Sequence, residues 1–189
     1  MSSNNGLHLP RRKFIQAAGG VAGALIVSPA IAKQEQQKGA RTIALHNLHT
    51  GEKNKVDYWI DGAYDPEALA ELDKLLRDHR SNEICTIDTQ LIDLLHDVQQ
   101  KVERNGKPFE VISGYRSPTT NAKLREKSRK VAKNSYHMQG KAVDVQIKGC
   151  DSRDLFEAAR ALKGGGVGFY GSNRFVHVDV GSVRSWGRK

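Results

Sequence analysis

Cysteine is scarce in this chain, with only Cys85 and Cys150 among 189 residues. Two cysteines cannot build the disulfide framework of a small secreted scaffold. No C-x-x-C pair is present, so the sequence offers neither a redox motif nor a cysteine-based structural zinc site. The two thiols either join in an oxidising compartment or stay separate, and the sequence leaves both possibilities open.

Aromatic residues make up only 6% of the chain, although the formal net charge is +9. The basic residues are scattered and are not gathered on a helix with interleaved aromatics, which argues against a nucleic-acid partner. A basic surface of this kind suits an acidic cell-wall polymer. Three successive glycines at 164–166 do not by themselves make a phosphate-binding loop, and no internal repeat is found.

Long hydrophobic runs are missing beyond residue 32, so no later segment predicts a membrane span. Before that point, Arg11 and Arg12 are followed one residue later by Phe14, and an uncharged segment continues to Ala32. This pattern is typical of a twin-arginine export leader. The last three residues of the segment, Ala-Ile-Ala, fit the small-x-small rule and predict cleavage before Lys33. A retained anchor is the alternative, because the uncharged length approaches what a bilayer needs.

The sequence therefore predicts three parts: a twin-arginine signal peptide at 1–32, a flexible Gln/Lys-rich lead-in at 33–40 and one domain at 41–189. Loss of the leader lowers the formal charge from +9 to +6. The remaining length supports one sizeable core. We expect recognition by the twin-arginine machinery, delivery to the periplasm of a Gram-negative-type cell, no stable membrane insertion after cleavage, and a monomer.

Helices and strands are expected to mix along the domain. Alternating or apolar runs at 42–48 and 55–60 predict a β-hairpin, and Phe109–Ile112 predicts a further strand. Asp65 and Pro66 open an apolar-striped helix, and a second helix is expected from Asp88 to about Glu103. Two more are predicted at 120–129 and 154–162. This order favours an α+β domain over a doubly wound parallel sheet.

The segment 135–144 reads as half of a metal site. His137 lies in a predicted loop, Gly140 permits a turn, and Asp144 lies on an alternating strand with its side chain away from the apolar face. His177 lies on a second alternating strand at 176–180, again opposite the valines. Paired in one sheet, these strands would direct His137, Asp144 and His177 into one groove. Three mixed nitrogen and oxygen ligands leave a fourth position for water, as in catalytic zinc sites.

The segment 135–144 also resembles, nearly letter for letter, the S-x-H-x-x-G-x-A-x-D signature of the zinc D-Ala-D-Ala peptidase superfamily, which includes the hedgehog signalling domain. The S-G-Y-R-S segment at 113–117 matches the superfamily too, and this resemblance implies that Arg116 lies in the active cleft. Together with segments 47–52 and 164–170, the whole exported part resembles the murein endopeptidases of this superfamily. The implied fold is a small antiparallel sheet that bears one Zn²⁺ per chain and is flanked by helices.

One departure concerns the general base. Carboxypeptidases of the superfamily carry a glutamate three residues before the last histidine, where this chain has Arg174. Asp179 shares a strand face with His177 and is the nearest acidic substitute for taking a proton from zinc-bound water. Alternatively, Asp179 orients His177, or it is purely structural.

The resulting hypothesis is a zinc-dependent murein endopeptidase that uses zinc-activated water to cut peptide cross-links of peptidoglycan. Arg116 would bind a substrate carboxylate or stabilise the oxyanion, and Ser135 would hydrogen-bond the peptide. A murein D,D- or L,D-carboxypeptidase is the alternative enzyme. A zinc-containing cell-wall binding module is the alternative outside enzymes.

Overall fold

The computed structural model describes residues 39–104, 106–128 and 131–187, all within the unit Gln36–Lys189. The predicted signal peptide at 1–32 and the lead-in up to residue 38 lie outside the described residues. Within the described ranges, no helix has the length and apolar character needed to cross a membrane.

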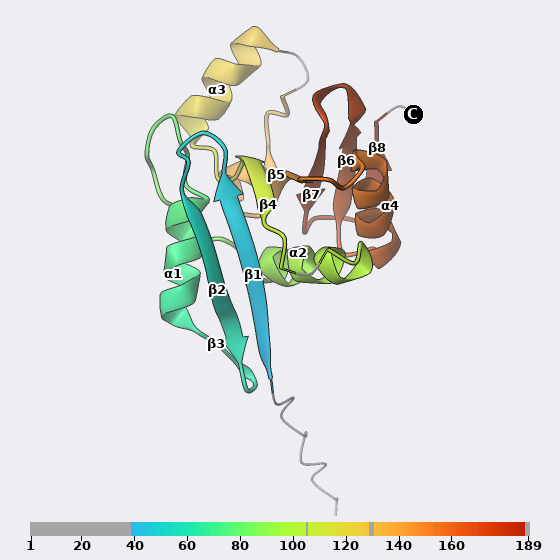
Figure 1. Cartoon of the computed structure of the whole chain (residues 1–189). Helices are drawn as coiled ribbons and strands as arrows, with labels where there is room; N and C mark the ends of the chain where they lie inside the picture. Colours follow the sequence, from blue (N-terminus) through green and yellow to red (C-terminus); the bar gives the residue numbers. More distant parts are fainter. Residues whose placement is uncertain (1–38, 105, 129–130, 188–189) are drawn as a thin grey trace, which may run out of the picture. The chain divides into compact units, whose positions relative to one another are not determined.

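An eight-stranded mixed sheet forms the centre of this unit, in the order β3-β2-β1-β4-β5-β7-β6-β8 (Figure 1). Neighbouring strands are antiparallel except for β1 with β4 and β6 with β8, which are parallel. The strands are β1 (Ala40–Asn47), β2 (Lys53–Ile60), β3 (Ala63–Tyr64), β4 (Phe109–Ser113), β5 (Ala142–Ile147), β6 (Gly166–Tyr170), β7 (Phe175–Asp179) and β8 (Arg184–Trp186).

The α+β class predicted from the sequence is confirmed, and so is the β1–β2 hairpin. The sheet is larger than the small one expected, and it is mixed, whereas an antiparallel sheet was expected. The long connection that contains α1 and α2 returns the chain beside β1 in the parallel direction, and β8 likewise returns beside β6. Parallel neighbours need such crossovers, whose destination is not encoded in local alternation.

Each α-helix starts at an aspartate or serine cap. Asp65 accepts hydrogen bonds from the first turn of α1 (Pro66–Leu75), and Asp88 does the same for α2 (Thr89–Lys101). Helices α3 (Pro118–Lys127) and α4 (Ser152–Leu162) begin two residues before their predicted starts, because Ser117 and Asp151 supply the caps. Such a cap contributes about 1 kcal/mol to stability.

The core lies on one face of the sheet. Val143, Val145 and Ile147 of β5 and Val176 and Val178 of β7 are all buried there, as their alternation predicts. Helices α1, α2 and α4 contribute the other buried apolar side chains of the same cluster. Helix α3 follows the end of β4 and stands apart from those three helices (Figure 1). The opposite face of β5 and β7 is therefore available for polar side chains.

The cysteines do not form a disulfide. Cys85 and Cys150 are both free and half-buried. Burial raises the pKa of each thiol, so neither is an activated nucleophile.

Candidate metal centre

The register between β5 and β7 places two of the predicted ligands side by side. Asp144 pairs directly with His177, and Ala142 pairs with Asp179, so all of these side chains lie on the face opposite the core. On the other edge of β5, Asp144 pairs with Ser113 just after an irregularity in β4. Bulges of this kind often redirect a strand end next to a functional site.

His137 reaches the same point from a short 3₁₀ turn, η1 (Tyr136–Gln139). The Ser135 hydroxyl oxygen caps this turn by accepting a hydrogen bond from the His137 amide at 3.3 Å. Gly140 ends the turn with φ = 66°, the left-handed conformation expected of it. A Cβ at Gly140 would lie 2.3 Å from the Thr86 carbonyl oxygen. This close approach fixes the turn that carries His137.

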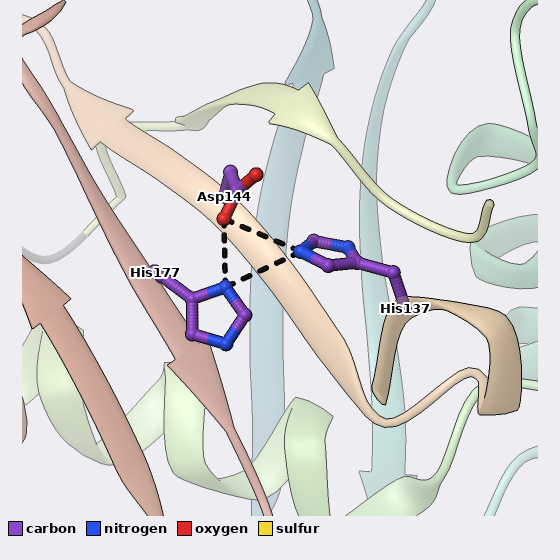
Figure 2. A group of neighbouring side chains, drawn as sticks. All are labelled: His137, Asp144 and His177. Atoms are coloured by element: carbon purple, nitrogen blue, oxygen red, sulfur yellow. Dashed lines mark hydrogen bonds and ion pairs between the residues drawn. The ribbon is translucent and has the colours of Figure 1, made fainter. Parts of the chain in front are cut away.

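Three ligand atoms converge in the arrangement shown in Figure 2. His137 Nε2 lies 3.2 Å from His177 Nδ1 and 3.4 Å from Asp144 Oδ1, and the latter two atoms are 2.8 Å apart. Ligands at about 2.0–2.1 Å from a tetrahedral zinc are separated by about 3.3 Å. The spacing of the three atoms therefore suits one small cation between them.

The protons of both rings are directed away from this point. His137 Nδ1 lies 2.8 Å from the Gly114 carbonyl oxygen, which can only accept, so this nitrogen carries the proton. His177 Nε2 lies 3.0 Å from the Asp179 carboxylate and carries its proton for the same reason. Neutral rings then present two bare lone pairs beside the Asp144 carboxylate. Such a set of acceptors favours a positive charge, which a metal ion or a further proton can supply.

The pKa shifts of His177 and Asp144 also indicate that the site favours a positive charge. Burial by itself lowers the pKa of His177, but its hydrogen bonds and charge interactions with Asp144 and Asp179 outweigh burial and raise the pKa to about 9. Burial by itself raises the pKa of Asp144, but the neighbouring His137 and His177 bring it well below its usual range. In the metal-free protein a proton on His177 therefore takes the place of the cation.

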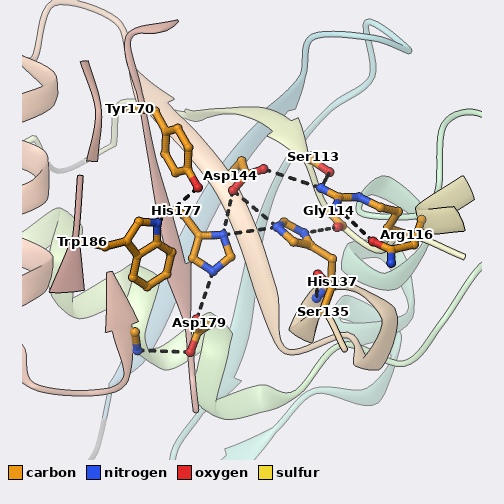
Figure 3. A network of polar contacts seen from close by, with 12 residues as sticks. Ser113, Gly114, Arg116, Ser135, His137, Asp144, Tyr170, His177, Asp179 and Trp186 are labelled. Carbon is orange, nitrogen blue, oxygen red and sulfur yellow. Dashed lines mark hydrogen bonds and ion pairs between the residues drawn. The ribbon is translucent and has the colours of Figure 1, made fainter. Parts of the chain in front are cut away.

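Asp179 lies on the far side of the His177 ring from the three ligand atoms (Figure 3). Its side chain is 0% exposed. It accepts hydrogen bonds from the Gly166 and Gly181 amides and from two nitrogens of Arg184. These donors and His177 keep its pKa well below the usual range, although burial alone would raise it. Asp179 is thus a buried carboxylate that contacts His177 Nε2 at 3.0 Å.

Arg116 approaches the cluster from the opposite side, in the loop after β4. Its amide donates a hydrogen bond to the His137 carbonyl oxygen at 3.1 Å, which joins this loop to the turn η1. Its guanidinium makes long hydrogen bonds to Asn121 at 3.3 Å and Ser113 at 3.4 Å, and it stands 3.9 Å from Asp144. Its Nε is buried and has no partner among the described residues. Burial lowers the pKa of this guanidinium. Each terminal nitrogen of the guanidinium carries two N–H groups and makes only one long hydrogen bond to the described residues, so the group retains donors for a bound anion.

Arg116 and the three converging residues, His137, Asp144 and His177, line a groove of about 780 Å³. Of the described residues that line it, Asp144 is the only carboxylate, whereas Arg80, Arg116 and Arg184 are all basic. Arg174, which occupies the sequence position of the carboxypeptidase glutamate, is an exposed residue in the turn after β6 and does not line the groove. The groove thus favours an anionic substrate.

The sequence reasoning missed several residues of this groove, including Tyr170, Arg184 and Trp186. Their place depends on β6 pairing with β7 and on β8 pairing with β6, which no local pattern encodes. Trp186 packs against the His177 ring with ring centroids 5.2 Å apart. The one available signal was the alternation of β6, which puts Tyr170 on the same face as Gly168.

The comparisons with known proteins agree with this geometry. A family model described as "Peptidoglycan L,D-endopeptidase MepK" matches residues 35–186. The chain belongs to the MepK family. The MepK of Escherichia coli K12 is 43% identical over 178 residues, covering 93% of this chain and 96% of the relative. A probable MepK of Haemophilus influenzae is 36% identical over 176 residues, covering 93% and 95%. Membership of the MepK family thus extends across the sheet and the groove and does not rest on one motif.

Proposed function

We propose that this protein is a zinc-dependent peptidoglycan endopeptidase that hydrolyses peptide cross-links. The observation that carries the proposal is the convergence of two imidazole nitrogens and one carboxylate oxygen within 3.4 Å of one another, in a groove lined by three arginines. The relatives are called L,D-endopeptidases. The bond to be cut is accordingly one between an L-configured and a D-configured centre.

His137, Asp144 and His177 are the proposed ligands of one Zn²⁺. Bound there, zinc would activate a water and polarise the scissile carbonyl. The Arg116 Nη2 atom lies 3.9 Å from Asp144 and makes one long hydrogen bond to Ser113, so its guanidinium would hold a substrate carboxylate or the oxyanion. The Ser135 oxygen caps the metal loop, and its hydroxyl proton, for which the described residues offer no acceptor, would bind the substrate peptide.

Asp179 has a positioning role in this proposal. Its oxygens are engaged by His177, Arg184 and two amides, and they lie behind the His177 ring. From there Asp179 keeps the His177 proton on Nε2 and its Nδ1 lone pair directed at the metal. Of the roles that the sequence left open, orientation of His177 is the one that this burial supports.

The site of action follows from the leader. We propose that residues 1–32 direct export through the twin-arginine machinery, that cleavage leaves a lead-in up to residue 40 and a peptidase domain at 41–189, and that the product works as a monomer in the periplasm. Peptidoglycan lies in that compartment, and its acidic peptides suit the three arginines of the groove.

Purified protein incubated with cross-linked muropeptide dimers tests the function. We expect zinc-dependent conversion of dimers to monomers, loss of conversion with a chelator, and recovery with added zinc. Release of single terminal amino acids would instead identify a carboxypeptidase. Binding of dimers without cleavage, in protein that holds one zinc per chain, would identify a binding module and refute the endopeptidase.

The ligands have a separate test. His137→Ala and His177→Ala should each abolish zinc binding measured by elemental analysis, whereas His96→Ala should retain it, because His96 lies on α2 outside the groove. Unchanged zinc content in the first two variants would contradict the assignment.

A further inference from the structure

A tyrosine hydroxyl faces the candidate metal centre from the side opposite Arg116. Tyr170 is the last residue of β6, and Arg116 follows β4, while the ligand strands β5 and β7 lie between these two strands. Figure 3 shows Tyr170 and Trp186 on one side of the three ligands and Arg116 on the other. Both Tyr170 and Arg116 line the same groove. A substrate bound over the ligands would therefore lie between them.

The hydroxyl of Tyr170 is held by an indole. Trp186 Nε1 lies 3.2 Å from Tyr170 Oη. An indole N–H can only donate, so the tyrosine oxygen accepts this hydrogen bond. The tyrosine proton then has no acceptor among the described residues. It remains available to a group in the groove.

Packing fixes the tyrosine as well. The Tyr170 ring stacks on Phe175, with centroids 4.6 Å apart and planes inclined by 15°. Trp186 packs against His177 at 5.2 Å and lies beneath the guanidinium of Arg184 at 5.1 Å. Trp186 therefore contacts both the Tyr170 hydroxyl and the proposed ligand His177, and this packing suits a hydrogen-bond donor that acts without reorganising.

Gly168 makes this arrangement possible. It pairs with His177 on one side and with Trp186 on the other. A Cβ at Gly168 would lie 2.5–2.7 Å from atoms of the Trp186 ring. Only a residue without a side chain lets the indole cross β6 and reach both His177 and Tyr170.

We propose that Tyr170 is a catalytic residue whose hydroxyl donates a hydrogen bond to the negative oxygen formed when water adds to the scissile carbonyl. Arg116 serves the same oxygen, or a neighbouring carboxylate of the substrate, from the other side. The hydroxyl keeps its proton throughout, so the step needs no further reactant. The inference rests on the proposed endopeptidase function. It adds a hydrogen-bond donor that stabilises the negative oxygen, in a chain that has Arg174 where carboxypeptidases carry a glutamate.

Tyr170→Phe tests the inference, because it removes the hydroxyl and leaves the ring on Phe175. Zinc content and melting temperature should stay at the values of the unmodified protein. With a cross-linked muropeptide dimer, kcat should fall about 10²–10³-fold, as for loss of one oxyanion donor, with KM within threefold. A phosphinate analogue, whose tetrahedral phosphorus replaces the scissile carbonyl, should lose affinity by a similar factor. The control is Tyr64, which lies on the remote strand β3 and whose hydroxyl is hydrogen-bonded to Asp93. Tyr64→Phe should leave zinc content, melting temperature, kcat, KM and phosphinate affinity unchanged.

A kcat within threefold of the unmodified protein would overturn the proposal, and so would a loss of kcat that follows loss of zinc. If Tyr170→Phe fails to fold, Trp186→Phe decides, since it retains a ring but removes the indole N–H that holds the hydroxyl. It should weaken phosphinate binding more than binding of the intact dimer, and equal effects on both would refute the role. An unmodified protein that leaves dimers intact would instead refute the endopeptidase function itself.

Discussion

Replacement of Asp179 by asparagine distinguishes most directly between two roles for this residue, orientation of His177 and acceptance of a proton from water. One carboxylate oxygen, Oδ1, accepts from the Gly166 amide at 3.1 Å and the Gly181 amide at 2.9 Å. The asparagine oxygen would take that place, because both groups are donors. The new NH₂ group would then face His177 Nε2, which the carboxylate now contacts at 3.0 Å. Two donors in contact are unfavourable, so the imidazole proton would move to Nδ1.

A proton on His177 Nδ1 competes with the metal, because this atom is one of the three that converge. Loss of such an orienting carboxylate weakens metal binding by about 10–100-fold. This corresponds to about 1.4–2.8 kcal/mol. We therefore expect Asp179→Asn to bind zinc 10–100-fold more weakly in competition with a chromophoric chelator, and to regain most of its hydrolytic rate at saturating zinc.

The control is Asp97→Asn, which alters an exposed aspartate beside His96 at 3.4 Å and should leave zinc affinity unchanged. The opposite result for Asp179→Asn would be unchanged zinc affinity with a rate that stays low at saturating zinc. That outcome would make Asp179 the proton acceptor and would refute the positioning role.

Three further predictions follow from the scaffold. Gly140→Ala should lower both the free energy of unfolding and zinc affinity, because its Cβ would meet the Thr86 carbonyl oxygen. The control is Gly51→Ala, where φ is a similar 75° but the space is open; it should cost only about 1–2 kcal/mol in denaturant unfolding and leave zinc affinity intact. Equal losses in the two variants would contradict the argument. The pKa of His177 is raised to about 9 from an ordinary value of 6.5, so its charged form stabilises the metal-free protein fully below about pH 6.5 and this stabilisation is lost as the pH rises through 9. Melting temperatures of chelated protein should fall across that range, and a rise would refute the assignment. Asp78→Ala should destabilise the protein by about 1–3 kcal/mol in denaturant unfolding, because it leaves the buried Ser117 amide without its acceptor at 2.9 Å. Asp78→Asn should recover part of this loss. Equal stability of the two variants would contradict the prediction.

Local sequence patterns were sufficient to predict that the proposed ligands Asp144 and His177 share one face, but not what surrounds them. Alternation in β5 and β7 is a property of residues two apart, so it placed Asp144 and His177 on one face before any pairing was known. The turn at Gly140 was predicted from one residue, and its φ of 66° confirms it. Tyr170 and Trp186 were missed because they reach the groove only through the pairing of β6 with β7 and β8.

The general base illustrates the same limit. Proximity along one strand made Asp179 a candidate for contact with water, since it shares a face with His177. The structure adds what periodicity cannot, namely that the Gly166 amide of β6, the Gly181 amide and Arg184 enclose the carboxylate and leave it 0% exposed. This burial depends on how β6 and the turn after β7 fold around Asp179, and it supports the proposed positioning role.

The pairing of Asp144 with His177 across β5 and β7 also connects metal supply to folding. A slip of either strand by one residue would exchange its polar and apolar faces, and valines such as Val143 or Val178 would then occupy the groove. Such a misaligned chain would lack the three-donor site. Zinc bound as proposed would therefore stabilise only molecules whose strands are natively aligned, so its availability would select the correct alignment among competing ones.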